Sequence, residues 1–354
     1  MRLLSPLIAV GLTVVSGFVI FLIYGVDPLG ALYVYFVEKL TAWWSIQDLI
    51  VKMTPLIMIA VGLALCYLGN VWNIGAEGQL ALGAIAGSIV PVFFPDFHGV
   101  LAITLMLLLG IFGGMVWGAI PALLKIRFGT NEILTSLMLV YIAGFLLDWL
   151  ARGPWRDPHG HNFPNSRPFS DGQVLPVIAG QHVTVSVVFA LVIAVAAWFV
   201  LRHTLAGFRI NVLGQAPRAG AFAGFSRSRG ILLAFLVSGG LAGLAGICEV
   251  MGPLGQLRIN VSPGYGFTAI IVAFLGRLNP LSIVLAAFVL ALSYLGGEGV
   301  QITYGVSDQV SRVFQGLLLF FVLACDTLIL YRIRLARAAS AHPRPSPDME
   351  HGHA

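Results

Sequence analysis

Residues 100–124 read VLAITLMLLLGIFGGMVWGAIPALL, a run without a single charged side chain. An α-helix rises about 1.5 Å per residue, so about 20 apolar residues are enough to cross a hydrocarbon core of about 30 Å. Comparable runs recur, and we expect further spans near residues 3–24, 49–68, 74–94, 131–150, 183–201, 230–251, 265–276, 280–297 and 312–331. The sequence therefore predicts an all-α, polytopic helix bundle with about ten transmembrane helices.

The composition excludes a soluble fold. Of the 354 residues, 58% are hydrophobic and 10% are charged, and the mean hydropathy is +0.92. An average soluble domain has roughly 25% charged residues. No strand-length alternation of apolar and polar residues recurs, which disfavours a β-barrel. Helices must then satisfy the backbone hydrogen bonds inside the lipid.

The two ends of the chain differ in character. Residues 3–24 are too long for the apolar region of a signal peptide and lack an A-x-A cleavage pattern, so we expect a retained first helix. Residues 1–335 form the predicted transmembrane domain. Residues 336–354 are the predicted disordered tail, because residues 341–354 hold prolines and histidines and almost nothing apolar.

The distribution of arginine predicts the orientation. Segment 202–229 carries five arginines and no acid, and the C-terminal tail is also rich in arginine. Positive loops stay in the cytoplasm, so both segments and both termini are expected there. Segment 151–182 is rich in proline and has the composition of an irregular external loop. The net charge of +5 follows from the cytoplasmic bias and gives no reason to expect nucleic acid as a partner.

Residues 70–79, Asn70-Val-Trp-Asn-Ile-Gly-Ala-Glu-Gly-Gln79, interrupt two apolar runs with polar side chains and glycines. Polar groups inside a membrane normally face the bundle interior or a water-filled path, and broken helices in transporters expose backbone where a substrate passes. A pore-lining break is one interpretation. The other is a turn at the cytoplasmic surface, with Asn73 as an N-cap and Glu77 in the first helical turn. The sequence motif is compatible with both interpretations.

A second interruption runs from Gly252 to Phe267 and is followed by a short apolar stretch that ends near Pro280. About twelve apolar residues are too few for a comfortable span, so a broken or re-entrant element is expected. The nearby acids Glu249 and Glu298 lie close to the ends of spans. Interfacial positions explain them more simply than a proton relay does.

Glycines recur four residues apart in three of the runs, and such spacing lets membrane helices approach closely. They are Gly83 and Gly87, Gly110, Gly114 and Gly118, and Gly239 and Gly243. A compact bundle accounts for them. The three cysteines, Cys66, Cys248 and Cys325, lie inside apolar runs and form neither a disulfide framework nor a CxxC metal site.

Motifs for bond-making chemistry are missing from the sequence. No G-x-x-x-x-G-K-[ST] loop, G-x-S-x-G turn or H-E-x-x-H helix occurs. We therefore expect no catalytic residues, no metal site and no cofactor bound by this chain. Any ATP hydrolysis must take place in a partner.

Three motifs in chain order carry a family resemblance: Asn73–Gln79 (NIGAEGQ), Ser238–Gly246 (SGGLAGLAG) with Glu249 and Gly252, and Gly264–Pro280 (GYGFTAIIVAFLGRLNP). Together they resemble permease subunits of bacterial ABC importers in the branched-chain amino acid and ribose superfamily. The nucleoside and simple-sugar branch is the most similar, in its larger permease type. The resemblance implies an inner-membrane location, alternating access, two ATPase subunits that hold ATP and Mg²⁺, a second permease in a heterodimer, and a periplasmic or lipid-anchored substrate-binding protein.

The resemblance also implies that residues 211–224 dock on the ATPase. Small residues at 216–224 independently predict a short helix with a smooth face, suited to a groove on a partner. The alternative is an ordinary positive loop. The expected ATPase-coupling residues are Gly214, Gln215, Arg218, Ala219, Ala223 and Gly224.

Polar and aromatic side chains of the two interruptions are the expected substrate path, because they offer hydrogen bonds and ring stacking to a nucleoside or a sugar. These are Asn70, Trp72, Asn73, Glu77, Gln79 and Tyr265. Riboflavin is also compatible. An ion- or proton-coupled secondary transporter, with Glu77 as the protonatable group, is a rival hypothesis. A passive channel or a membrane scaffold is a third.

Overall fold

The computed structural model describes residues 4–160, 163–180, 182–307 and 309–330. Within these residues, seven helices are long and apolar enough to cross a membrane. They are α4 (Trp43–Leu68), α5 (Ala76–Phe93), α6 (Val100–Phe128), α7 (Glu132–Arg152), α8 (Ser186–His203), α11 (Arg227–Glu249) and α13 (Pro280–Tyr304). The predicted disordered tail, 336–354, lies outside the described residues.

Three further helices contain shorter apolar stretches: α1 (Leu4–Ile23), α12 (Tyr265–Leu275) and α14 (Gln309–Leu330). Each of the ten predicted runs falls on one of these ten helices. The prediction of an all-α membrane bundle is therefore confirmed. Ten transmembrane helices were expected, whereas seven of the described helices have the length and composition of a full span. The ends also differ, since α4 begins at Trp43, ahead of the predicted residue 49.

Short elements connect the long helices. Between α1 and α4 lie α2 (Pro28–Tyr33), the π-helix η1 (Val34–Glu38) and α3 (Lys39–Thr41). Between α8 and α11 lie α9 (Leu205–Gln215) and α10 (Pro217–Phe222), and α11 continues as the π-helical turn η3 (Val250–Leu254). The predicted irregular loop between α7 and α8 is more ordered than expected. It holds the 3-10 turn η2 (Asp171–Gln173) and an antiparallel hairpin of β1 (Val177–Ala179) and β2 (Val183–Thr184).

Helix α11 lies at the centre of the bundle and packs against α4, α5 and α6. Its glycines allow these contacts. A Cβ atom on Gly114 of α6 would overlap the carbonyl oxygen of Gly239, and one on Gly83 of α5 would overlap the backbone of Gly243. The predicted close approach at the glycine repeats is therefore confirmed, and it brings three helices together with backbone in direct contact.

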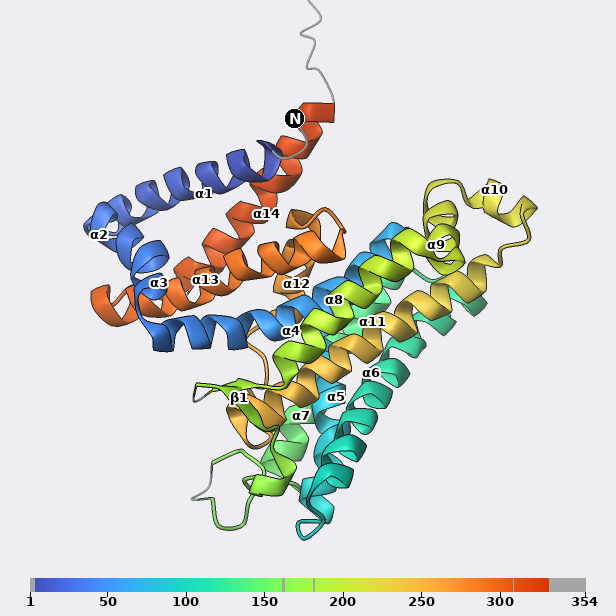
Figure 1. Cartoon of the computed structure of the whole chain (residues 1–354), viewed down its shortest axis with the longest axis horizontal. Helices are drawn as coiled ribbons and strands as arrows, with labels where there is room; N and C mark the ends of the chain where they lie inside the picture. The colour runs from blue at the N-terminus through green and yellow to red at the C-terminus, as the bar shows by residue number, and fades with distance from the viewer. Residues whose placement is uncertain (1–3, 161–162, 181, 308, 331–354) are drawn as a thin grey trace, which may run out of the picture.

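The bundle has two chemically different ends, which Figure 1 shows at the upper right and at the bottom. We call the first the basic end, because α9 and α10 project there beside the C-terminus of α6, which carries Lys125 and Arg127. We call the second the loop end, because the β hairpin and the α7–α8 connection lie there. The described ends of α1 and α14, Leu4 and Leu330, lie near one another (Figure 1).

The chain between α11 and α13 crosses the bundle as a broken element. At the loop end, the backbone N–H of Leu257 donates to Ser166 Oγ at 2.9 Å. The following residues are not helical until Tyr265, where α12 begins after Gly264 with φ +105°. Helix α12 ends close to the C-terminus of α4, since Phe274 stacks on Tyr67. The predicted broken or re-entrant element is confirmed.

Candidate functional site

Asn73, Gln79 and Ser238 form a buried hydrogen-bonded cluster between the end of α4 and the start of α5, and we call this cluster the polar lock. Asn73 is fully buried, and its Nδ2 donates to Gln79 Oε1 at 2.9 Å and to Ser238 Oγ at 3.0 Å. Its Oδ1 accepts from the backbone N–H of Gly75 at 2.9 Å. Each polar group of the amide has a partner, as buried polar groups require. The side chain therefore fixes the break and the start of α5 to the central helix α11.

The interpretation of this segment as a turn with Asn73 as the N-cap is wrong at Asn73, whereas Glu77 does lie in the first turn of α5. The N-cap position of α5 is Gly75, without a side-chain cap, and Asn73 lies two residues earlier. A solvent-facing cap would leave Asn73 accessible, whereas its relative exposure is 0%. The break is stabilised by contacts with α11 and α7, because Ile74 N–H also donates to Ser136 Oγ at 3.2 Å.

The two interrupted segments meet at Glu77 and Gly266. The Glu77 carboxylate accepts a hydrogen bond from the backbone N–H of Gly266 at 2.6 Å. A Cβ atom on Gly266 would overlap the backbone of Glu77, so this approach of α12 to α5 requires glycine. Tyr265 lies directly beside this contact and is buried. The structure thus joins residues that the sequence placed in two separate motifs.

Three aromatic rings close the space on the side of this contact that faces the basic end. Tyr67 of α4, Trp72 of the break and Phe274 of α12 pack with ring centroids 5.2 to 6.1 Å apart. The Tyr67 hydroxyl also donates to the carbonyl oxygen of Asn73 at 3.2 Å. We call these three residues the aromatic cluster.

Charged side chains line a cavity on the side that faces the loop end. Lys52 Nζ of α4 lies 2.9 Å from Glu298 Oε1 of α13, and Lys52 and Glu249 both line the cavity with Tyr265. Glu249 is the last residue of α11, near the end of its span as expected, and it is 9% exposed and packed inside the bundle. Sequence reasoning did not single out Lys52. Its place inside the apolar run 49–68 is the signal that could have found it.

The six residues predicted for the substrate path do not all lie together. Glu77 and Tyr265 lie at the meeting point of α5 and α12, whereas Asn73 and Gln79 bond to each other and, through Asn73, to Ser238 of α11. Trp72 lies next to them and keeps 37% of its surface exposed. Asn70 lies apart from this group.

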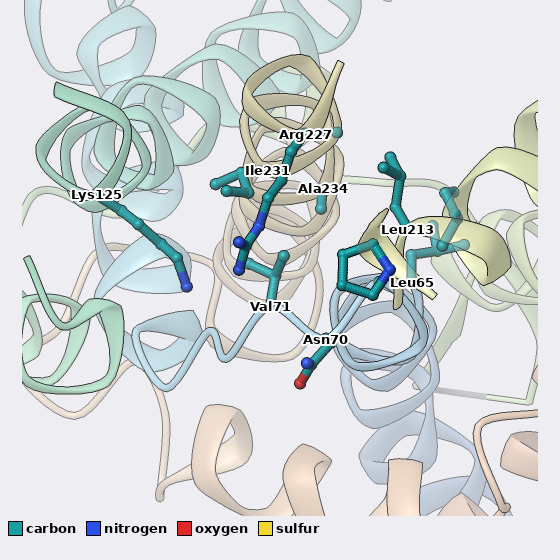
Figure 2. A pocket seen from close by; sticks show the side chains of 12 residues that line it. Leu65, Asn70, Val71, Lys125, Leu213, Arg227, Ile231 and Ala234 are labelled. Carbon is teal, nitrogen blue, oxygen red and sulfur yellow. The ribbon is translucent and has the colours of Figure 1, made fainter. Parts of the chain in front are cut away.

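Asn70 lines a pocket at the basic end, in which Lys125 and Arg227 extend toward the apolar wall of Val71 and Ile231 (Figure 2). Its φ of +53° is a left-handed conformation that asparagine tolerates. Lys125 forms a short ion pair with Glu132, which begins α7. Leu213 and Pro217 bring α9 and α10 to the same pocket.

The predicted ATPase-coupling residues occupy α9, α10 and the turn that follows. The predicted short helix is confirmed as α10, where Arg218 and Ala219 are exposed. Gln215, Ala223 and Gly224 are exposed as well. Gly214 faces inward instead, because a Cβ atom there would overlap the carbonyl oxygen of Leu68 at the end of α4. The segment therefore has a free outer face and an inner face seated on α4.

Phe222 is a feature of this segment that sequence reasoning missed. It ends α10, and 95% of its surface is exposed. It shares α10 with the exposed Arg218 and Ala219.

In the described part of the chain, no group of three His, Cys, Asp or Glu side chains could hold a metal ion. The three cysteines are free and buried. The two broken segments bring hydrogen-bonding groups, charges and aromatic rings together inside the bundle.

Broken segments that meet inside a bundle of membrane-spanning helices are typical of membrane transporters. Residues 45–323 match the family of the branched-chain amino acid transport system permease component, and the chain belongs to that family.

Relatives extend this assignment over nearly the whole chain. The glucose ABC transporter permease protein TsgB13 of Haloferax volcanii is 35% identical, over 94% of this chain and 90% of its own length. The nucleoside ABC transporter permease protein NupB of Lactococcus lactis is 27% identical, over 96% and 95%. The guanosine ABC transporter permease protein NupP of Bacillus subtilis is 28% identical, over 91% and 93%. The chain is thus a multi-pass permease subunit of the ABC importer type, as the sequence motifs indicated.

Proposed function

We propose that the chain forms half of the membrane path of an ATP-driven importer for a sugar or a nucleoside, paired with a second permease of similar fold in the inner membrane. The support is the convergence of relatives described for glucose, nucleosides and guanosine, each aligned over at least nine tenths of this chain. Such solutes are rich in hydroxyl groups, and nucleosides add an aromatic base. The polar and aromatic lining of the bundle suits both.

The path is proposed to run past the contact between Glu77 and Gly266, which is the single observation that carries this assignment. Tyr265 lies at that contact, Trp72 packs against Phe274 of the same helix α12, and Asn73 and Gln79 form the polar lock on α11; all four remain proposed path residues. Two interrupted segments that meet inside the bundle can separate without breaking a continuous helix. Alternating access would then open the route on either side of this point.

Force from the ATPase subunits is proposed to enter through α9 and α10. Two partner ATPases would hold ATP and Mg²⁺ in the cytoplasm, and this chain would bind neither. The exposed face of Arg218, Ala219 and Phe222 offers a docking surface, and the inner face at Gly214 seats on the last turn of α4. Because the break at residues 69–75 follows that turn directly, a displacement of α9 reaches Trp72 and Asn73 over a short distance.

The orientation follows from the same proposal. The basic end faces the cytoplasm together with both termini, in keeping with the positive charge of α6 and of segment 202–229. The loop end then faces outward. Its ordered hairpin and the α7–α8 connection are placed to contact a periplasmic or lipid-anchored binding protein.

Co-purification from native membranes tests the assembly. We expect the unmodified chain to bring down an ATPase and a second permease, and Ala219→Glu to lose the ATPase because it adds a charge to the docking face. Ala179→Glu is the matched control, since Ala179 is exposed on β1 at the opposite end. An unmodified chain that brings down no ATPase under mild conditions would contradict the proposal.

Uptake assays test the substrate class. Cells that rely on this chain should accumulate labelled glucose or labelled guanosine against a gradient, and uptake should stop when ATP is depleted. Uptake that follows an ion gradient and survives ATP depletion would instead support a secondary transporter.

A further inference from the structure

The pocket at the basic end lies apart from the proposed path, and Figure 2 shows it from close by. It has a volume of about 40 Å³ and lies between the last turn of α4, the end of α6, α9, α10 and the first two turns of α11. Helices α4 and α11 both have the length and composition of membrane spans, so the pocket lies level with the ends of two spans. Solvent and lipid headgroups meet at this level. We call it the basic pocket, after Lys125 and Arg227 in its wall.

The basic pocket has an excess of positive charge. Lys125 of α6 and Arg227 of α11 both extend into it (Figure 2). Arg227 is exposed, and among the described residues none forms a hydrogen bond or an ion pair with its guanidinium group. Lys125 pairs with Glu132, but an ammonium group has three N–H donors and keeps some of them for a second acceptor. Glu132 does not line the pocket, and no other acidic side chain of the described chain does so.

The rest of the wall strengthens these two charges. Apolar side chains lie beside the cations, among them Val71, Leu213 and Ile231. Charges next to apolar groups are screened less than charges in water, so the two cations repel one another more and attract an anion more. An arginine in open solvent gains little from an ion pair. The pocket therefore favours an anion more than the other exposed arginines of the basic end do.

The hydrogen-bond donors of the basic pocket come from three different elements. Arg227 offers the planar fork of its guanidinium group, Lys125 an ammonium group, and Asn70 an exposed side-chain amide in the break after α4. Donors that approach from different sides suit a tetrahedral phosphate better than a flat carboxylate. At about 10–15 Å³ for each water-sized group, the pocket has room for one phosphate group and not for a whole nucleotide.

We propose that the basic pocket binds a single anionic phosphate group through Arg227, Lys125 and Asn70. The bound group joins α6 to α11 and to the break after α4, beside Leu213 of α9 and Pro217 of α10. The site goes beyond the proposed function, because it takes no part in binding the transported solute. Two sources present the same chemistry: inorganic phosphate from the solvent, and the headgroup of an anionic lipid such as phosphatidylglycerol.

Protection of a cysteine in the pocket tests the site in the full chain. Asn70→Cys places a thiol in the wall and keeps Lys125 and Arg227, and the native cysteines are buried. In detergent, inorganic phosphate should slow the reaction of residue 70 with methyl methanethiosulfonate about fivefold or more. Acetate at equal ionic strength should leave the rate within about twofold. Ala179→Cys, exposed on β1 at the loop end, is the control and should react at the same rate with and without phosphate.

A charge-matched pair of variants separates the pocket from the general positive charge of the basic end. Arg227→Gln, added to Asn70→Cys, should abolish the protection by phosphate. Arg229→Gln removes the same charge from an exposed position two residues later, outside the pocket wall, and should retain the protection. Equal loss of protection in the two variants would mean a diffuse attraction of anions and would overturn the proposal.

Thermal unfolding gives a second measurement, in which Asn70 is kept. A ligand that binds the folded chain raises the thermal midpoint by mass action. Phosphate should raise the midpoint of the unmodified chain and of Arg229→Gln by about 3 °C, and that of Arg227→Gln by less than about 1 °C. A cooperative transition of Arg227→Gln without phosphate shows that this variant is folded. A rise of equal size in all three chains would contradict the proposed role of Arg227.

Reconstitution in nanodiscs distinguishes the two sources of phosphate. Slower labelling of residue 70 in phosphatidylglycerol than in phosphatidylcholine, without added phosphate, assigns the pocket to a lipid headgroup. Protection by inorganic phosphate alone assigns it to a soluble ligand. Either result supports the site if Arg227→Gln removes the protection. If neither phosphate nor phosphatidylglycerol protects residue 70, or if acetate protects it equally well, the proposal is wrong and the importer assignment is unaffected.

Discussion

The Glu77 carboxylate accepts a 2.6 Å hydrogen bond from the backbone N–H of Gly266, which lies 189 positions further along the chain. This bond links the first turn of α5 to the first turn of α12. Each of these turns follows a non-helical segment inside the bundle. The two breaks therefore form one structural unit, with the charged cavity on one side and the aromatic cluster on the other.

Gly266→Ala tests how closely this unit is packed. The added Cβ atom would overlap the backbone of Glu77, which cannot move without displacing α5. Overpacking of this kind costs about 1–3 kcal/mol, so we expect a lower thermal midpoint in detergent and a loss of most uptake. Gly144→Ala is the control, because nothing lies within 4 Å of a Cβ atom there. Equal stability and uptake in the two variants would mean that α12 and α5 are not in contact in the working importer.

Asn73→Ala tests the polar lock. The change leaves the Gln79 amide and the Ser238 hydroxyl without their shared partner in the bundle interior. Each buried polar group left unpaired costs about 1–3 kcal/mol, so the thermal midpoint should fall. Asn70→Gly should have little effect, because Asn70 makes no part of this lock and glycine tolerates its left-handed backbone. An unchanged midpoint for Asn73→Ala would show that the lock adds little to stability.

Gly214→Leu tests the proposed route from α9 to α4. The larger side chain would push α9 off the carbonyl oxygen of Leu68, while the exposed face of α10 stays intact. We expect the ATPase to co-purify as before and solute uptake to fall at least tenfold. Loss of the ATPase together with uptake would mean that residue 214 supports docking itself, and not the transfer of movement to α4.

A double-mutant cycle tests the ion pair between Lys125 and Glu132. This pair joins the end of α6 to the start of α7, and both side chains are largely buried. Removing one partner of a buried pair costs about 3–5 kcal/mol, whereas replacing both costs much less. Lys125→Met alone should therefore lower the thermal midpoint more than Lys125→Met combined with Glu132→Gln. If the loss of stability in the double variant equals the sum of the losses in Lys125→Met and Glu132→Gln alone, the two side chains are not energetically coupled.

Much of the fold was predictable because a membrane restricts the options of a chain. Apolar runs of spanning length, such as residues 100–124, must become helices in lipid, and each of the ten predicted runs falls on a helix of the described residues. The glycine repeats likewise indicated close helix packing, as Gly114 and Gly239 show. The broken element near α12 was predictable from its length alone.

The sequence by itself therefore determined the class of the molecule, its helices and the two interruptions, because these depend on local hydropathy and local backbone preference. The tertiary structure alone decided what the polar residues do. In the folded chain Asn73 donates a hydrogen bond to Ser238, the Gly266 N–H donates to Glu77, and Lys52 pairs with Glu298. The partners in these contacts lie 165 to 246 positions apart in the sequence. Such pairings depend on which helix faces meet in space, and no spacing within one segment encodes that.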